Sequence, residues 1–184
     1  TVPKHFAAYG AAMAGRDYAQ TEVSIRSFHE VYLPPFRAAI DAGAPAIMPA
    51  FTDLDGIPMT ANRTALKHIL RTRWHFDGVV ISDYNAIAEL VPHGIAADIA
   101  EAAALALKAG VDIDMMGHAY TRGLPLALQS GLVTIEEMAV DVTTAEGPEM
   151  GRTVETSGGA PMRVATAADR QAFEALFLAV MNHE

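Results

Sequence analysis

The sequence of 184 residues contains no cysteine. This absence excludes disulfide bonds and thiolate metal sites. It does not indicate whether the chain occupies an oxidising or a reducing compartment. No apolar run reaches the about 18 residues that a membrane-spanning helix needs, so none is predicted. Basic residues are also few, because 13 Lys and Arg stand against 22 Asp and Glu, which gives a formal net charge of -9. This charge argues against nucleic-acid binding, which requires a basic surface.

Motifs for nucleotides and metals are missing as well. The glycines form neither a G-x-G-x-x-G nor a Walker pattern, so no nucleotide cofactor is expected. The histidines lack the spacing of metal ligands, and we therefore expect neither a metal site nor any other cofactor. Five of the seven histidines lie between the two ends of the chain, namely His29, His68, His75, His93 and His118. The N-terminal residues 1–5 do not form a signal peptide and resemble the end of a strand, so the chain is expected to begin inside a larger domain.

The residues that are present predict a folded α/β domain. Hydrophobic residues make up 51% of the chain and charged residues 19%, which suffices for a buried core. Short apolar runs bounded by turn residues are typical of strands buried on both faces of a parallel sheet. They span residues 46–51, 78–83 and 110–116, with 2–8 as a fourth candidate. Pro49 lies inside one run and predicts a bulge or a strand end there.

Helical segments alternate with these runs. Ser24, Asn62 and Asp98 are expected to cap three helices, and Thr134 with Glu137 forms the capping-box pattern of a fourth. Four alternations of strand and helix predict an α/β fold with right-handed crossovers. The periodicity does not distinguish a closed barrel from an open, doubly wound sheet.

The C-terminal part has a different character. Residues 143–166 are rich in Gly, Pro, Thr and Glu without periodicity, which predicts a linker or mobile tail. Residues 167–184 predict an amphipathic helix, and the rest of the chain is expected to supply a surface for it, because an isolated helix of this length is marginal. Its apolar face comprises Phe173, Leu176, Phe177, Val180 and Met181.

Polar residues at strand ends are the candidates for chemistry, since ligands of parallel α/β folds bind at the carboxyl ends of the strands. Asp83 ends an apolar run, and a carboxylate is a suitable nucleophile toward an anomeric carbon because the transition state is positive. Its alternative role is that of a helix cap or turn residue. Lys4 and His5 end the first run and offer donors to sugar hydroxyls, or they are an exposed basic pair. We expect Asp83, Lys4 and His5 to line one concave site.

Other candidates have equally plain structural alternatives. Met48 and Phe51 form either an apolar wall below a sugar ring or part of the core. Asp112 and Asp114 alternate along a predicted strand and so face the same side. They either share a metal or proton, or they accept hydrogen bonds from backbone and loop.

Six segments taken together resemble family 3 glycoside hydrolases. Each motif alone is weak, and their order and spacing carry the resemblance. The segments are K-H-F-A-A-Y-G (4–10), G-R-D-Y (15–18), S-I-R-S-F-H-E-V-Y-L-P-P-F (24–36), M-P-A-F-T-D-L-D-G-I-P-M-T-A-N (48–62), W-H-F-D-G-V-V-I-S-D-Y (74–84) and A-G-V-D-I-D-M-M (109–116).

The resemblance implies a TIM-barrel-type fold, of which residues 1–142 match the C-terminal half of the catalytic barrel domain, about four β/α units. It implies a retaining β-glucosidase mechanism with Asp83 as the nucleophile. The sugar-binding residues would be Lys4, His5, Met48, Phe51 and Tyr84. It further implies a β-glucoside or short oligosaccharide as the partner, and a periplasmic or secreted location.

The match has gaps that leave alternatives open. The acid/base of many members lies outside such a segment, and Glu89 and Glu101 look like positions on helix surfaces. The isolated chain is therefore expected to hydrolyse glucosides poorly. One alternative is a non-catalytic barrel remnant that binds sugar or a protein partner, and another is a Schiff-base lyase that uses a buried Lys4. A half-barrel leaves two open sheet edges, which predicts a homodimer that completes the barrel or, failing that, coverage by the final helix.

Overall fold

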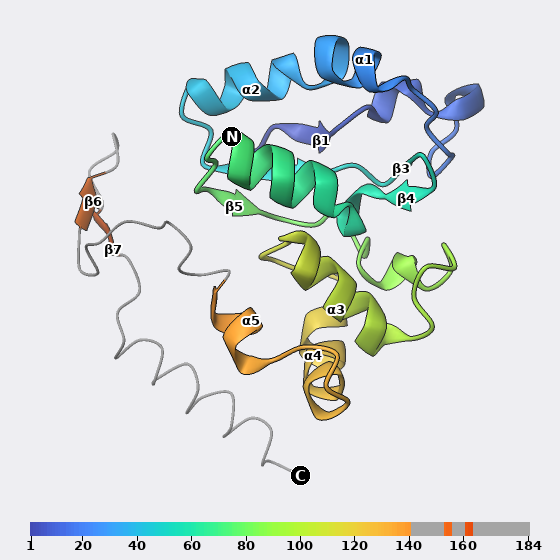
Figure 1. The fold of residues 1–184 in the computed structure, drawn as a ribbon, viewed down its shortest axis with the longest axis vertical. Helices are drawn as coiled ribbons and strands as arrows, with labels where there is room; N and C mark the ends of the chain where they lie inside the picture. The colour runs from blue at the N-terminus through green and yellow to red at the C-terminus, as the bar shows by residue number, and fades with distance from the viewer. Residues whose placement is uncertain (141–152, 156–160, 164–184) are drawn as a thin grey trace. The chain divides into compact units, whose positions relative to one another are not determined.

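The computed structural model describes residues 1–140, 153–155 and 161–163. These residues belong to two compact units, Thr1–Val133 and Thr134–Glu184 (Figure 1). In the first unit, the strands are β1 (Lys4–Phe6), β2 (Ala46–Pro49), β3 (Asp53–Leu54), β4 (Ile57–Pro58) and β5 (Val79–Val80). Its α-helices are α1 (Ile25–Ser27), α2 (Pro34–Asp41), α3 (Ile99–Ala109) and α4 (Ala119–Gln129). Shorter or wider helical segments are Tyr9–Ala11, Met13–Gly15, Phe28–Tyr32, Met59–Ala61, Thr64–Arg73 and Ala88–Leu90.

The central sheet is parallel and follows the order of the chain. β1 pairs with β2, and β2 pairs with β5, where Ile47 is the partner of Val80. Helical segments connect successive strands, as a β/α alternation requires. Figure 1 shows α1 and α2 along one side of these strands. The α/β prediction with a parallel sheet is confirmed.

The fourth predicted strand, residues 110–116, is much shorter than expected. It contributes only an isolated parallel bridge between Ile81 and Ile113. The carboxylate of Asp112 accepts the hydrogen bond of the Val80 backbone N–H at 2.6 Å. A side chain thus replaces the backbone carbonyl that a continued ladder would offer to β5. The prediction of a full strand here was wrong for this reason.

The irregularity expected at Pro49 is present. Pro49 is the last residue of β2, and the register against β1 shifts between Lys4 and Phe6. Proline has no N–H to donate, so the ladder cannot continue regularly through it. The peptide bonds Lys4–His5 and Phe6–Ala7 in the facing strand are cis.

The helix caps lie where the sequence predicted them. Ser24 accepts a hydrogen bond from the backbone N–H of Ser27 at 3.0 Å, and Asn62 accepts one from that of Ala65 at 3.0 Å. Asp98 caps α3 through the N–H groups of the second and third helical residues. α3 ends at Gly110, whose φ of 99° is the left-handed conformation that glycine adopts without strain.

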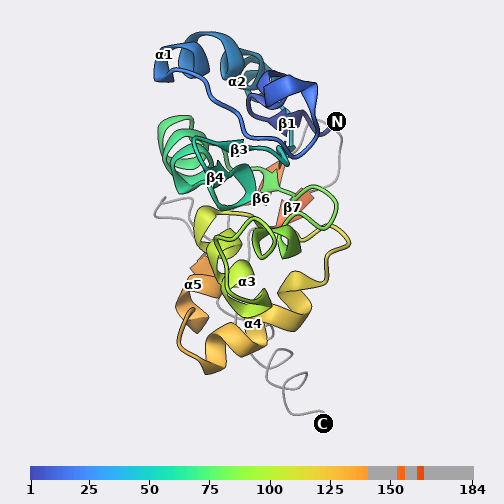
Figure 2. The ribbon, with the colours of Figure 1, turned by 90° about the vertical axis from the view of Figure 1, so that its right-hand side faces the viewer.

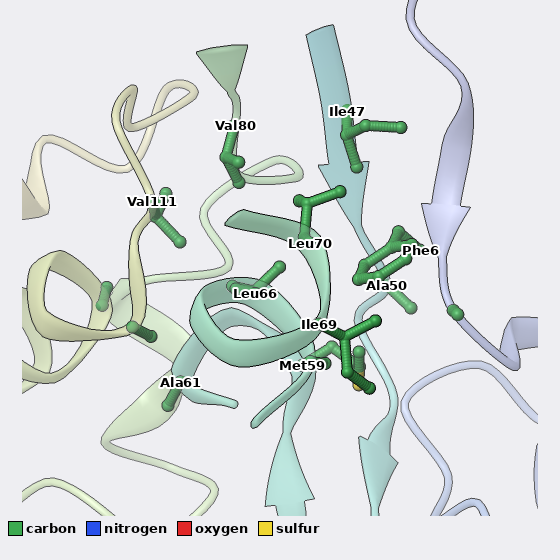
Figure 3. Packing of buried hydrophobic residues seen from close by; sticks show 14 of the residues in the cluster. Phe6, Ile47, Ala50, Met59, Ala61, Leu66, Ile69, Leu70, Val80 and Val111 are labelled. Atoms are coloured by element: carbon green, nitrogen blue, oxygen red, sulfur yellow. The ribbon is translucent and has the colours of Figure 1, made fainter. Parts of the chain in front are cut away.

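The core lies between the helix Thr64–Arg73 and the sheet. Leu66, Ile69 and Leu70 point from this helix toward residues of β1, β2 and β5, as Figure 3 shows. Leu66 and Leu70 are fully buried, as are Phe6, Ile47 and Val80. Each such side chain contributes about 1.5–3 kcal/mol by leaving water. This packing fixes β5 and therefore the position of the residues that follow it.

The β3–β4 hairpin and helix α4 of the first unit were not predicted. β3 and β4 form an antiparallel hairpin whose turn residues, Asp55 and Gly56, both have positive φ. The Asp-Gly pair is a known signal for such a turn. α4 contains Gly123 and Pro125, which conceal a helix from propensity arguments. A Cβ atom at Gly123 would lie 2.3 Å from the carbonyl oxygen of Ile99, so α3 and α4 pack closely there (Figure 2).

The described part of the second unit consists of α5 (Ile135–Val140), β6 (Thr153–Glu155) and β7 (Pro161–Arg163). The capping box is confirmed, because the N–H of Thr134 donates to Glu137 and the N–H of Glu137 donates to Thr134. β6 and β7 are antiparallel and lie within the predicted linker. The rest of residues 143–166 and the predicted helix 167–184 lie outside the described residues. Within the described ranges, no helix is long and apolar enough to cross a membrane.

Candidate active site

Asp83 follows β5 and is almost fully buried, with 5% of its surface exposed. Its Oδ1 accepts a hydrogen bond from the backbone N–H of Tyr84 at 2.7 Å. The neighbouring Ser82 is also buried, and its hydroxyl donates to the carbonyl of Asp83 and accepts from the N–H of Met115. The backbone around Asp83 is therefore fixed from two directions, and one carboxylate oxygen is held in place.

The structure brings Asp83 and His5 together. Nε2 of His5 lies 3.1 Å from Oδ2 of Asp83, a distance typical of electrostatic contact. The angles are not those of a hydrogen bond, and this Oδ2 is buried without a hydrogen-bond partner among the described residues. Burial lowers the pKa of His5, an effect that the charges of Asp83 and Asp17 oppose and that Lys4 reinforces. The lowered pKa favours the neutral imidazole of His5, which can donate one hydrogen bond and accept one.

The other predicted sugar-binding residues lie in different environments. Lys4 is exposed, and it pairs with the buried Met48 across β1 and β2. Phe51 is half-buried against Tyr18, with ring centroids 4.6 Å apart. Tyr84 is 59% exposed. Among the described residues, no hydrogen bond or ion pair joins Lys4, Met48, Phe51 or Tyr84 to the carboxylate oxygens of Asp83, apart from the bond of the Tyr84 backbone N–H.

Sequence reasoning missed the loop between β1 and α1. The ring of Tyr9 stacks on His5, with centroids 4.4 Å apart and planes inclined by 29°. The hydroxyl of Tyr9 donates a hydrogen bond to Asp17, and this bond is the main cause that raises the pKa of Tyr9 to about 12. Tyr9 belongs to the motif of residues 4–10 and Asp17 to that of residues 15–18. No periodicity in the sequence, however, signals a side-chain contact across a loop.

Glu89 has a stronger link to this site than its predicted position on a helix surface suggests. It is half-buried. Burial raises its pKa, and the charge of Asp83 adds to that effect, whereas Asn85 and His93 oppose it. Glu89 likewise raises the pKa of Tyr18, for which burial is the larger cause. The prediction of a simple surface carboxylate was therefore incomplete, because the helical pattern carries no information on the loop packed beside it.

Replacing Glu89 with Gln is expected to stabilise the chain at pH 7 and to leave its stability unchanged near pH 4. A carboxyl with a raised pKa binds more protons in the folded than in the unfolded state, so its ionisation opposes folding as pH rises through the folded pKa. Glutamine keeps the size of the side chain and removes the ionisation. Urea unfolding at both pH values measures the difference, and an equal effect at both would contradict this account.

The remaining carboxylates have structural partners. Asp112 binds Arg71 at 2.6 Å as well as the Val80 backbone, and Oδ2 of Asp114 accepts from the N–H of Tyr120 at 3.1 Å. These contacts correspond to the second of the two roles predicted for Asp112 and Asp114, in which they accept hydrogen bonds from backbone and loop. Oδ1 of Asp114 is buried without a hydrogen-bond partner among the described residues. Glu101 accepts from the N–H of Ala97 at the start of α3. Within the described residues, no group of three or more His, Asp or Glu side chains is arranged to hold a metal ion.

Two surface hollows are not lined by the carboxylate itself. One, of about 660 Å³, is lined by residues of the helical segments around α2 and by Trp74. The other, of about 370 Å³, includes Lys4, His5 and Tyr9 together with residues 31–36. Neither is lined by Asp83. The candidate site therefore rests on the contacts around Asp83.

Comparison with known proteins identifies the class. The glycosyl hydrolase family 3 N-terminal domain matches residues 1–145. The chain belongs to this family.

Among individual relatives, the chain is 44% identical to the periplasmic β-glucosidase of Salmonella typhimurium over 138 residues, which is 75% of this chain and 18% of the relative. It is 44% identical over 115 residues to a β-xylosidase of Formosa agariphila, covering 61% of this chain and 16% of that protein. The structure of β-glucosidase from Listeria innocua in complex with glucose has a TM-score of 0.73 and 42% identity, covering 76% of this chain and 19% of that chain. The chain thus spans less than a fifth of the length of the curated relatives named here.

Proposed function

We propose that the chain is part of a retaining β-glycosidase, acting on terminal β-linked glucose, in which Asp83 is the nucleophile. The observation that carries this proposal is the state of the Asp83 carboxylate. One oxygen is held by the Tyr84 N–H, while the other is buried beside His5 without a hydrogen-bond partner among the described residues. Buried polar atoms are rarely left unpaired, and exceptions call for an explanation such as a catalytic role.

In the proposed reaction, Oδ2 of Asp83 attacks the anomeric carbon, the C–O bond to Asp83 forms, and the glycosidic bond breaks with its electrons going to the leaving oxygen. A second carboxyl group, about 5–5.5 Å from the nucleophile, protonates that oxygen in its acid form. As a carboxylate it then takes a proton from water, which attacks the anomeric carbon and releases Asp83. We expect this acid/base outside the residues of this chain. Neutral His5 and the exposed Lys4 would bind sugar hydroxyls. Met48, Phe51 and Tyr84 would form the apolar walls.

The relatives suggest the substrate and the location. Their names include β-glucosidase and β-xylosidase, two activities on sugars that differ by the exocyclic CH₂OH group. We propose a terminal β-glucoside or a short oligosaccharide as the substrate. One relative is named as periplasmic, and we propose a periplasmic or secreted location for this chain as well.

Covalent labelling of the 184-residue chain tests this function. A 2-deoxy-2-fluoro-β-glucoside with a dinitrophenolate leaving group requires no acid, because the leaving group is stable as an anion. The fluorine slows both steps, and the activated leaving group lets the glycosyl-enzyme accumulate. We expect a peptide carrying Asp83 to be labelled, and the corresponding xyloside to label more slowly. Failure of both reagents to label the peptide would contradict the proposal.

The alternatives give different results in the same experiment. A barrel remnant that only binds sugar would bind the reagent but leave the Asp83 peptide unlabelled. A Schiff-base lyase would be trapped on Lys4 by borohydride in the presence of a carbonyl sugar. That alternative required a buried Lys4, and Lys4 is exposed. The structure therefore does not favour it.

We propose that residues 1–142 form about four β/α units of a TIM-type barrel, the second half of the barrel domain. The chain-order pairing of β1, β2 and β5 and the bridge from Ile81 to Ile113 support this arrangement. Eight strands close such a barrel. Beyond β1 and beyond Ile113, no further strand of the described sheet is present, and Ile113 is 47% exposed. A homodimer could supply the other half, and light scattering at micromolar concentration would show a dimer rather than a monomer.

A further inference from the structure

A chain of contacts leads from Asp83 back to the loop between β1 and α1. Asp83 lies beside the imidazole of His5, the imidazole stacks on Tyr9, and the hydroxyl of Tyr9 donates to Asp17. Asp17 is exposed, whereas Asp83 is buried. The three contacts therefore connect a group at the surface to the buried carboxylate through two aromatic rings.

The loop that carries Tyr9 and Asp17 is fixed at its far end. The N–H of Thr21 donates to the carbonyl of Asp53 and the N–H of Asp55 donates to that of Thr21, both at 3.2 Å, while Thr21 itself is fully buried. The N–H of Met13 donates to the carbonyl of Gln20 at 2.9 Å. The loop is thus attached to the β3–β4 hairpin, and this attachment limits how far Asp17 can move away from Tyr9.

An imidazole held only by its own backbone can rotate about its side-chain bonds. The face of the Tyr9 ring restricts that rotation for His5, since the two rings are stacked with their centroids 4.4 Å apart and stacking of aromatic rings is favourable. The Tyr9 ring in turn is held by Asp17, because a hydrogen bond to a carboxylate is about twice as strong as one between neutral groups. The two contacts together fix the direction of Nε2.

We propose that Tyr9 and Asp17 are positioning residues that keep Nε2 of His5 beside Oδ2 of Asp83. This inference rests on the proposed function of Asp83 and His5. Neither Tyr9 nor Asp17 touches the reacting atoms; both act through His5. Their contribution is geometric, because a reacting or binding group that shifts by about 1 Å can lose up to about 10²-fold in rate.

Four residues interact with His5. The charges of Lys4, Asp17 and Asp83 act on its pKa, and the ring of Tyr9 stacks on its imidazole. Among them, the charge of Asp17 raises the pKa of His5 against the larger effect of burial. Removing that charge therefore lowers the pKa of His5 further. This shift can be measured on the His5 ring signals by NMR without any enzymatic turnover.

The experiment compares Tyr9→Phe, Tyr9→Leu and Asp17→Asn with the parent chain. We expect Asp17→Asn to lower the pKa of His5, and Tyr9→Phe to reduce the ring-current shift on His5 because the ring loses its anchor. Tyr9→Leu should abolish that shift.

Labelling of Asp83 at saturating reagent should slow by about tenfold in Tyr9→Phe, since only orientation changes. Tyr120→Phe is the matched control, because it removes a tyrosine hydroxyl bound to the Val111 carbonyl, away from His5.

Two readouts separate the failure of this inference from the failure of the proposed function. If the parent chain is not labelled at all, the proposed function fails, and the His5 signals alone decide the role of Tyr9 and Asp17. The positioning role is overturned if His5 titrates and resonates identically in the parent, Asp17→Asn and Tyr9→Phe. It is also overturned if Tyr9→Phe labels as fast as Tyr120→Phe.

Discussion

Replacement of Asp83 with Gly is expected to abolish labelling by the activated fluoroglucoside and to slow glycosyl transfer from an unfluorinated dinitrophenyl β-glucoside by about 10⁴-fold. The loss follows from the removal of the attacking oxygen. Because Asp83 is buried, its removal leaves a space beside His5 that a small anion can enter. Added azide should then attack the anomeric carbon from the opposite face of the sugar, forming a C–N bond as the dinitrophenolate leaves. The product is α-glucosyl azide, identified by NMR.

Asp77→Asn provides the control for this prediction. Asp77 is exposed and precedes β5, whereas Asp83 follows it. The substitution removes a carboxylate from the other end of the same strand, and label uptake should equal that of the parent. Labelling that persists in Asp83→Gly, or azide that gives the β-anomer, would exclude Asp83 as the nucleophile.

The second large effect concerns stability. Asp112→Ala is expected to lower the free energy of unfolding of the first unit by about 2–3 kcal/mol. Asp112 binds both Arg71 and the backbone N–H of Val80, and only 24% of the Arg71 side chain and 21% of that of Asp112 are exposed. Without Asp112, the guanidinium keeps its bonds to the carbonyls of Phe76 and Gly78 but loses its anion. Urea unfolding of both proteins measures the difference.

A matched control is available on the surface. Arg37 and Asp41 also form an Arg–Asp pair at 2.9 Å, but their side chains are 44% and 56% exposed. Asp41→Ala should therefore cost about 0.5 kcal/mol or less, because exposed ion pairs contribute little. If Asp112→Ala and Asp41→Ala destabilise the chain equally, the partly buried pair has no special role in holding β5.

The sequence predicted those features that local chemistry determines. Caps at Ser24, Asn62 and Asp98 depend on one side chain and the next few N–H groups, so they could be identified directly. The parallel sheet followed from apolar runs between helices. The shortened fourth strand could not be foreseen, since the Asp112 carboxylate takes the N–H of a residue 32 positions earlier.

The candidate site shows the same division. The closeness of His5 and Asp83 followed from the rule that parallel strands end at one edge of the sheet. The stacking of Tyr9 on His5 depends on a loop in which Ala8, Ala14 and Tyr18 all have positive φ. Residues other than glycine adopt that conformation rarely, and no propensity argument predicts it. Side-chain contacts set by such a loop require coordinates.

The order of strands in the sheet has a consequence for how the chain acquires its structure. β2 pairs with β1, β5 pairs with β2, and Ile113 pairs with Ile81, so each later segment of the parallel sheet is added beside the one before it. These pairings join residues far apart in the sequence, such as Lys4 with Met48 and Ala46 with Val79, so each added strand carries the loop-closure cost that makes parallel pairing slow. During synthesis, β2 can pair with β1 before β5 has been translated. The site around Asp83 would then form only when β5 joins an existing template, so that His5 is in place before its partner arrives.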